Sequence, residues 1–225
     1  MHQFSRENPS PRYTELLGYY KTMHDEGAEN ENISAANTFD GRSMLRQAPN
    51  ILSIIKVLGS ETILDYGAGK GIQYGPMEIK NPDGETFSDM KSYWNVRSIT
   101  CFDPGHEPFS QLPEGNFDGV VTTDVLEHCP KDDIPWILHE IFSYAREFVY
   151  LNVACYPAKK TLPNGENAHC TLESPDWWKG VFDTVLVDYP NLRYYAVFDV
   201  PADKGNGTAQ IETVQIRGKN RQAGN

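Results

Sequence analysis

The sequence predicts an α/β fold: a doubly wound, mostly parallel sheet with helices on both faces and an antiparallel pair at one edge. Short apolar runs that end in acidic residues alternate with segments whose apolar residues recur at helical spacing. The 225 residues are 39% hydrophobic and 23% charged, which is enough for one domain with a substantial core. Ligands of such sheets bind outside the carboxyl ends of the strands, so the acidic strand ends predict one shared site.

The N-terminal part of the chain is expected to be helical. Tyr13, Leu16 and Tyr20 share one helical face, and a polar segment follows, so residues 1–38 are predicted to form a helix and a mobile cap. Apolar spacing then predicts a helix from Met44 to Leu58, closed by a glycine.

The main domain is expected over residues 39–217, followed by a frayed tail over 218–225. Alternation and β-branched runs predict strands at Thr62–Tyr66, Ser98–Asp103, Phe117–Thr123, Phe148–Ala154, Val185–Asp188 and Arg193–Val200, the last two as the antiparallel pair. Helical spacing predicts a helix from Ile134 to Ala145 and another that begins at Pro175, after the N-cap Ser174.

Charge and composition restrict the partners. The formal net charge is −11, which disfavours nucleic acid. No apolar run approaches the roughly 20 residues of a membrane span, and the N-terminus lacks the apolar core of a signal peptide. The four cysteines form no Cys-x-x-Cys pair, so reduced thiols are expected. We therefore expect a cytoplasmic protein that is a monomer or a homodimer and contacts no membrane.

A glycine turn follows the first predicted strand in the stretch ILDYGAGKG, residues 63–71. A Walker-type phosphate loop requires Ser or Thr after its lysine, but Gly71 follows Lys70 here. The dinucleotide fingerprint places its third glycine at the position of Ile72. Both phosphate-binding patterns are therefore disfavoured, and Lys70 is expected to be solvated.

The pattern Asp-x-Gly-x-Gly-x-Gly from Asp65 to Gly71, followed by CFDP at 101–104 and by FDGVV and DVLEH at 117–128, resembles the class I S-adenosylmethionine-dependent methyltransferases. The resemblance implies a Rossmann-like domain that binds S-adenosylmethionine. It further implies these cofactor-binding residues: Asp65, Gly67, Ala68 and Gly69 at the amino-acid end, Asp103 and Pro104 at the ribose, and Asp124 and Val125 after the third strand.

A second resemblance concerns Asp124-x-x-Glu127-His128 with the distant His169. This set is similar to the metal site of the small-RNA 3′-terminal 2′-O-methyltransferases, which implies a divalent ion held by Asp124, Glu127, His128 and His169 beside a sugar hydroxyl. His128, His169 and Glu127 are accordingly the catalytic candidates. The alternative is that these residues pack at the strand end, as in related methyltransferases that use no metal.

The expected function is methyl transfer from S-adenosylmethionine to a small-molecule acceptor, a hydroxyl of a sugar or glycan. The alternatives are a metal-independent N- or C-methyltransferase of another metabolite and a non-catalytic S-adenosylmethionine-binding protein; Ile72 disfavours a nicotinamide-dependent oxidoreductase. The Asn-Pro-Asp-Gly turn within 79–87 is expected to form a wall above the cofactor. Few residues separate Asp103 from Phe117, so a strand between them is expected to be short or missing.

Overall fold

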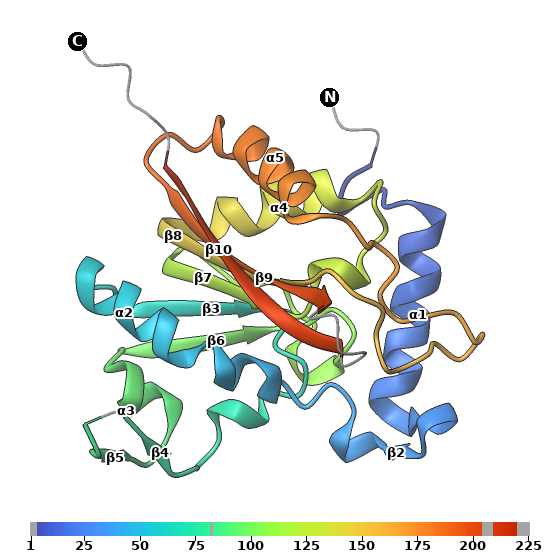
Figure 1. Cartoon of the computed structure of the whole chain (residues 1–225), viewed down its shortest axis with the longest axis horizontal. Coiled ribbons are helices and arrows are strands. Elements are labelled where there is room, and N and C mark those ends of the chain that lie inside the picture. Colours follow the sequence, from blue (N-terminus) through green and yellow to red (C-terminus); the bar gives the residue numbers. More distant parts are fainter. Residues whose placement is uncertain (1–3, 82, 204–208, 220–225) are drawn as a thin grey trace.

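The structure is a computed structural model that describes residues 4–81, 83–203 and 209–219. Within these residues one sheet has six strands in the order β10-β9-β8-β7-β3-β6 (Figure 1). Its strands are β3 (Thr62–Tyr66), β6 (Ser98–Phe102), β7 (Phe117–Thr123), β8 (Ala145–Ala154), β9 (Arg193–Asp203) and β10 (Ala209–Lys219). All neighbours are parallel except β9 and β10, which form an antiparallel pair at the edge. The predicted doubly wound sheet is confirmed.

Helices cover both faces of this sheet. They are α1 (Pro11–Glu26), α2 (Ala48–Leu58), α3 (Met90–Trp94), α4 (Ile134–Tyr144) and α5 (Pro175–Leu186). Successive strand residues point to opposite faces, so Leu64 packs with α4 and α5 while Ile63 packs with α2 and α3. Burial on both faces explains why the strands are continuous apolar runs rather than alternating ones.

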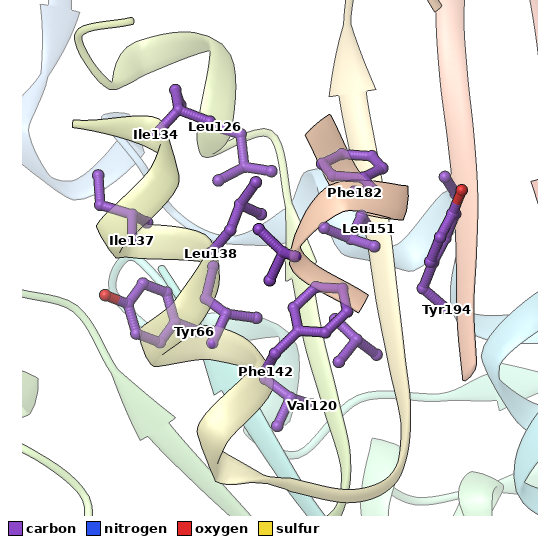
Figure 2. Close-up of a cluster of buried hydrophobic side chains, with 14 of the residues drawn as sticks. Tyr66, Val120, Leu126, Ile134, Ile137, Leu138, Phe142, Leu151, Phe182 and Tyr194 are labelled. Atoms are coloured by element: carbon purple, nitrogen blue, oxygen red, sulfur yellow. The ribbon is translucent and has the colours of Figure 1, made fainter. Parts of the chain in front are cut away.

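The face beneath α4 and α5 carries the larger apolar core, part of which Figure 2 shows. Ile134, Ile137, Leu138 and Phe142 of α4 belong to this core together with Val120 of β7, and all of them are essentially inaccessible to solvent. Full burial of each such side chain contributes roughly 1.5–3 kcal/mol to folding. This core fixes β7 and β8 and therefore the positions of their carboxyl ends.

Helix α1 crosses the carboxyl ends of the strands, at the right of Figure 1. Ser10 caps it by accepting the N–H of Tyr13, and the Ser10 hydroxyl itself donates to the buried carboxylate of Asp133. The guanidinium of Arg6 pairs with Glu140 just before the helix. The start of α1 is thus tied to α4 and to the residue before it, Asp133.

Three expectations about elements were wrong. Val185–Asp188 is not a strand, because Trp178, Phe182 and Val185 continue the buried face of α5; β9 pairs instead with β10. The helix expected from Met44 begins at Ala48, since a proline at the start of α2 cannot continue a preceding helix; a 3-10 turn, Arg42–Arg46, precedes it. Strand β10 also includes Gly218 and Lys219, which were assigned to the tail; residues 220–225 lie outside the described part.

The Asn-Pro-Asp-Gly segment forms a small antiparallel pair, β4 (Ile79–Lys80) and β5 (Thr86–Phe87). This pair lies beside α3, far from α1 in Figure 1, and Ile79 and Phe87 pack against the core beneath α2 and α3. It is therefore not a wall of the site at the strand ends. A second short pair, β1 (Gly27–Ala28) with β2 (Ile33–Ser34), follows α1.

In the described residues β6 is the edge strand, so the strand expected to be short or missing after Asp103 is absent there. The segment between β6 and β7 contains only a 3-10 turn, Glu107–Phe109. No helix among the described residues is long and apolar enough to cross a membrane.

Candidate active site

One cavity lies where α1 crosses the carboxyl ends of β3, β6 and β7. Its walls include four of the predicted strand-end groups, namely Asp65, Gly67, Gly69 and Asp103. Pro104, Asp124, Val125 and His128 line the same cavity. The parallel sheet thus brings together residues that lie as far apart in sequence as 65 and 128.

The glycine turn has a backbone conformation that residues other than glycine rarely adopt. Gly67, Gly69 and Gly71 have φ values of 86°, 59° and 66°, in the left-handed region. A Cβ on Gly67 would collide with the side chain of Val125, and one on Gly69 with the carbonyl of Phe39. The alternate glycines therefore permit the left-handed conformation and also the close approach of Val125 and Phe39 to the turn.

Each backbone N–H of this turn donates to an acceptor of the protein. Gly67 and Ala68 donate to the carbonyl of Phe102 at 2.7 and 3.0 Å, and Gly69 donates to the carboxylate of Asp103 at 2.8 Å. Lys70 donates to the carbonyl of Phe39 and Gly71 to that of Ala68. A phosphate loop works by pointing free N–H groups at the anion. This turn leaves none from 67 to 71 for that purpose.

Asp65 is a buried carboxyl group on the floor of the cavity. Its Oδ2 accepts the hydroxyl of Tyr74 at 2.7 Å and the amide N–H of Gln73 at 3.1 Å. Burial raises the pKa of Asp65 to about 7, although these two hydrogen bonds oppose the shift. A cationic ligand group would therefore find an acceptor that binding itself helps to ionise.

Asp103 occupies the end of β6, across the glycine turn from Asp65. Its two oxygens accept the N–H groups of Gly69 and Gly105, both at 2.8 Å. Burial raises its pKa, and these hydrogen bonds partly offset the rise. Because a carboxylate oxygen accepts more than one hydrogen bond, both oxygens keep capacity for ligand hydroxyls.

Three of the predicted metal ligands converge beside the cavity. Asp124, His128 and His169 each offer one ligand atom within 4.8 Å of the others. Asp124 has a φ of 61°, a left-handed conformation rare outside glycine, and its side chain remains 45% exposed. His169 comes from the long segment between β8 and α5, which the fold returns to the end of β7.

Carbonyl oxygens lie beside Nδ1 of both imidazoles in this cluster. Nδ1 of His128 lies 2.9 Å from the carbonyl oxygen of Ala168 and 3.1 Å from the hydroxyl of Tyr20, and Nδ1 of His169 lies 2.6 Å from the carbonyl oxygen of Tyr156. A carbonyl only accepts, so these contacts favour the tautomer with its proton on Nδ1 and a lone pair on Nε2. Burial lowers the pKa of His128 to about 4, which keeps this ring neutral.

Glu127, the fourth predicted ligand, lies outside the group of three. Its Oε1 accepts the N–H of Ala154 at the end of β8, and its backbone carbonyl accepts the N–H groups of Cys170 and Thr171. Burial raises its pKa well above the usual range, and the charge of Asp124 adds to the rise. Glu127 thus attaches the segment that carries His169 to the strand ends.

Several residues at the site have no motif in the sequence. Tyr20 and His24 of α1 line the cavity, and so does Gln73 from the 3-10 turn Ile72–Tyr74. The expectation that Lys70 is solvated was wrong, because its ammonium donates to the carbonyl of His24 at 2.8 Å. The glycine turn is thereby linked to the C-terminal end of α1.

No protein-family model and no curated protein matches this chain. One solved structure that resembles it is the Burkholderia thailandensis 1,6-didemethyltoxoflavin-N1-methyltransferase with bound 1,6-didemethyltoxoflavin and S-adenosylhomocysteine. The two chains are 14% identical, the comparison covers 94% of this chain and 92% of the other, and the TM-score is 0.49. A likeness at this level does not transfer an activity, so the function of this chain has to come from its own residues.

Proposed function

We propose that this protein transfers a methyl group from S-adenosylmethionine to a small-molecule acceptor, a hydroxyl of a sugar or glycan. The observation that carries the proposal is the glycine turn with its N–H groups occupied, placed between the buried carboxyl groups of Asp65 and Asp103. Such a site suits a ligand that has an ammonium group and a ribose but no phosphate. S-Adenosylmethionine has that composition.

The residues fit the two ends of this cofactor. No described residue donates to Oδ1 of Asp65, which is therefore free for an ammonium group. Asp103 is suited to accept hydrogen bonds from the two ribose hydroxyls. Gly67, Ala68 and Gly69 would pass beneath the chain between these ends, and Pro104, Asp124 and Val125 would contribute walls. When bound, the cofactor supplies the activated methyl group, and the protein aligns the acceptor with it.

We further propose a divalent metal at Asp124, His128 and His169. Two imidazoles and one carboxylate whose ligand atoms lie within 4.8 Å of one another are a donor set that suits Mn²⁺, Fe²⁺ or Co²⁺. Backbone carbonyls that hold each Nδ1–H are the usual partners of metal-binding histidines. A bound ion would lower the pKa of an acceptor hydroxyl. Glu127 would act as a positioning residue for His169.

A metal-independent enzyme is the alternative at the same place. The Nε2 atom of His128 or His169 would then accept the proton of the acceptor directly. That mechanism also serves an N- or C-methyltransferase of another metabolite. A non-catalytic binder of the cofactor is disfavoured, because two of the three converging groups, the imidazoles of His128 and His169, have no proposed role in cofactor binding alone.

A thermal-shift comparison tests the cofactor. S-Adenosylhomocysteine at 100 times its dissociation constant stabilises the folded state by about 2.7 kcal/mol, which raises the Tm of a chain of this size by roughly 5–10 °C. NAD at the same concentration should leave the Tm unchanged. Stabilisation by NAD without stabilisation by S-adenosylhomocysteine would refute the proposal.

Electron paramagnetic resonance of Mn²⁺ tests the metal without an identified acceptor. The wild-type protein should bind one Mn²⁺, and His128→Ala or His169→Ala should each weaken binding by at least tenfold. His139→Ala, on α4 beside Tyr189, is the matched control and should bind normally. Equal Mn²⁺ binding by all four proteins would refute the metal site and leave the metal-independent alternative. The acceptor itself is sought by transfer of a radiolabelled methyl group to panels of sugars and amines.

A further inference from the structure

Gln73 is a wholly buried amide in the wall of the cavity, next to Asp65. Its Nε2 donates to Oδ2 of Asp65 at 3.1 Å and to the carbonyl of Ala68 at 3.3 Å. The reverse amide orientation would point the side-chain oxygen at two acceptors. The two hydrogen bonds therefore fix which end of the amide is nitrogen and which is oxygen.

The side-chain oxygen of Gln73 is left without a donor. It is one of the few buried side-chain polar atoms that have no hydrogen-bond partner in the described part of the chain. The others belong to Glu31, Thr122, Glu127 and Trp178, none of which lines the cavity. A buried carbonyl without a donor is unfavourable, so an unpaired one in a cavity wall marks the place of a ligand donor.

Gly41 has no side chain and so leaves the space that the amide of Gln73 occupies. The backbone of Gly41 has a φ of 83°, and a Cβ there would collide with the amide of Gln73. Gly41 lines the same part of the cavity as Gln73 and Asp65. The surrounding backbone thus accommodates an amide that makes no hydrogen bond through its oxygen to any described residue.

We propose that Oε1 of Gln73 and the carboxylate of Asp65 together recognise a protonated primary amine, the amino group of the cofactor's amino-acid end. This inference rests on the proposed use of S-adenosylmethionine. An ammonium group has three N–H donors and can bond both acceptors at once. Asp65 supplies the charge, and Gln73 makes the site specific for a donor at that position. Gln73 is then a specificity-determining residue that the glycine motif does not include.

The test compares two ligands by isothermal titration calorimetry at pH 8, where Asp65 is mostly ionised. S-Adenosylhomocysteine has the amino-acid end, and 5′-methylthioadenosine lacks it. Gln73→Met removes the acceptor and should weaken S-adenosylhomocysteine by roughly tenfold or more, the usual effect of losing a hydrogen bond to a charged group. Binding of 5′-methylthioadenosine should change less than about twofold on the same reasoning, because that ligand does not reach Gln73.

Gln47→Met is the matched control, because Gln47 is also buried but bonds Tyr150 outside the cavity. It should leave the ratio of the two affinities unchanged. If Gln73→Met does not fold, Gln73→Glu decides: its carboxyl group, protonated on the oxygen that faces Asp65 and Ala68, keeps both that donor and an acceptor oxygen at the position of Oε1, so the preference for S-adenosylhomocysteine should be retained. An unchanged ratio in Gln73→Met, or a tenfold loss of preference in Gln73→Glu, overturns the role of Gln73 alone. Failure of the wild-type protein to bind S-adenosylhomocysteine overturns the proposed function and this inference together.

Discussion

The affinity for S-adenosylhomocysteine should depend steeply on pH between 6 and 8, because Asp65 titrates in that range. Burial raises the pKa of this carboxyl group to about 7 in the ligand-free protein. The ammonium group of the ligand favours the ionised form, so binding lowers that pKa and releases a proton. The affinity should therefore be highest well above pH 7 and should fall as the pH decreases through 7.

The magnitude follows from the fraction of molecules in which Asp65 is ionised. That fraction is about ten in eleven at pH 8 and about one in eleven at pH 6 for a pKa near 7. The dissociation constant should thus rise about tenfold from pH 8 to pH 6, equivalent to about 1.4 kcal/mol. At pH 7, binding should release about half a proton per ligand.

Calorimetry in two buffers of different ionisation enthalpy measures both quantities. The pKa values of His24 and His128, lowered by burial to about 3 and about 4, keep these rings neutral throughout the range. Asp65→Asn should bind more weakly and with a flat pH profile. Equal affinities of the wild-type protein at pH 6 and pH 8, with no proton release, would refute the reasoning.

Three further predictions concern stability and position. Asp65→Asn should raise the Tm of the ligand-free protein at pH 8 and raise it less at pH 5. The unfolded chain ionises this carboxyl near pH 4 and the folded protein only near pH 7, so the wild-type carboxyl costs progressively more stability between these two values; thermal melts without a pH-dependent difference would contradict this. Gly67→Ala should cost about 1–3 kcal/mol in denaturant unfolding, more than Gly59→Ala, whose φ is also positive at 73° but whose Cβ would meet nothing. Glu127→Gln should bind Mn²⁺ within about threefold of the wild-type protein, because Glu127 lies outside the three converging ligand groups and the amide keeps an oxygen that can accept the N–H of Ala154; a loss of tenfold or more would mean that Glu127 is itself a ligand.

The fold could be predicted from the sequence because the patterns that indicate its strands are local. Residues 63–64 and 120–121 are apolar at consecutive positions, as a strand buried on both faces requires, and Asp65 near the end of β3 marks its carboxyl end. The failures also have local causes. The run VLVD after position 184 has strand-like composition, and only the spacing from Trp178 and Phe182 assigns its first two residues, Val185 and Leu186, to α5. The pairing of β9 with a later strand depends on a partner that no local pattern specifies.

The site could be predicted only in part, because some of its residues are marked by local patterns and others are not. Asp65 and Asp103 end predicted strands, so their convergence follows from a parallel sheet. Gln73 ends no strand, and nothing in its neighbourhood marks it; its role depends on the return of residues 39–41 to the glycine turn. The position of α1 over the strand ends, and with it the link between Lys70 and His24, is likewise a property of the whole fold.

Several polar groups in the cavity lack partners in the ligand-free protein, and their burial reduces the stability of the fold. Asp65 is a carboxyl buried without a cation, and Gln73 offers an oxygen without a donor. Asp124, His128 and His169 place three potential ligand atoms within 4.8 Å of one another. Away from the cavity, Asp133 and Gln47 are paired, whereas atoms of Thr122 and Trp178 are not. An unpaired buried group destabilises the fold, and in a cavity wall a bound ligand can offset that destabilisation. A cationic amine would pair with Asp65 and Gln73, and a metal ion or the acceptor's proton would pair with the cluster of Asp124, His128 and His169. Ligand affinity and ligand-free stability should therefore change in opposite directions when Asp65 is neutralised.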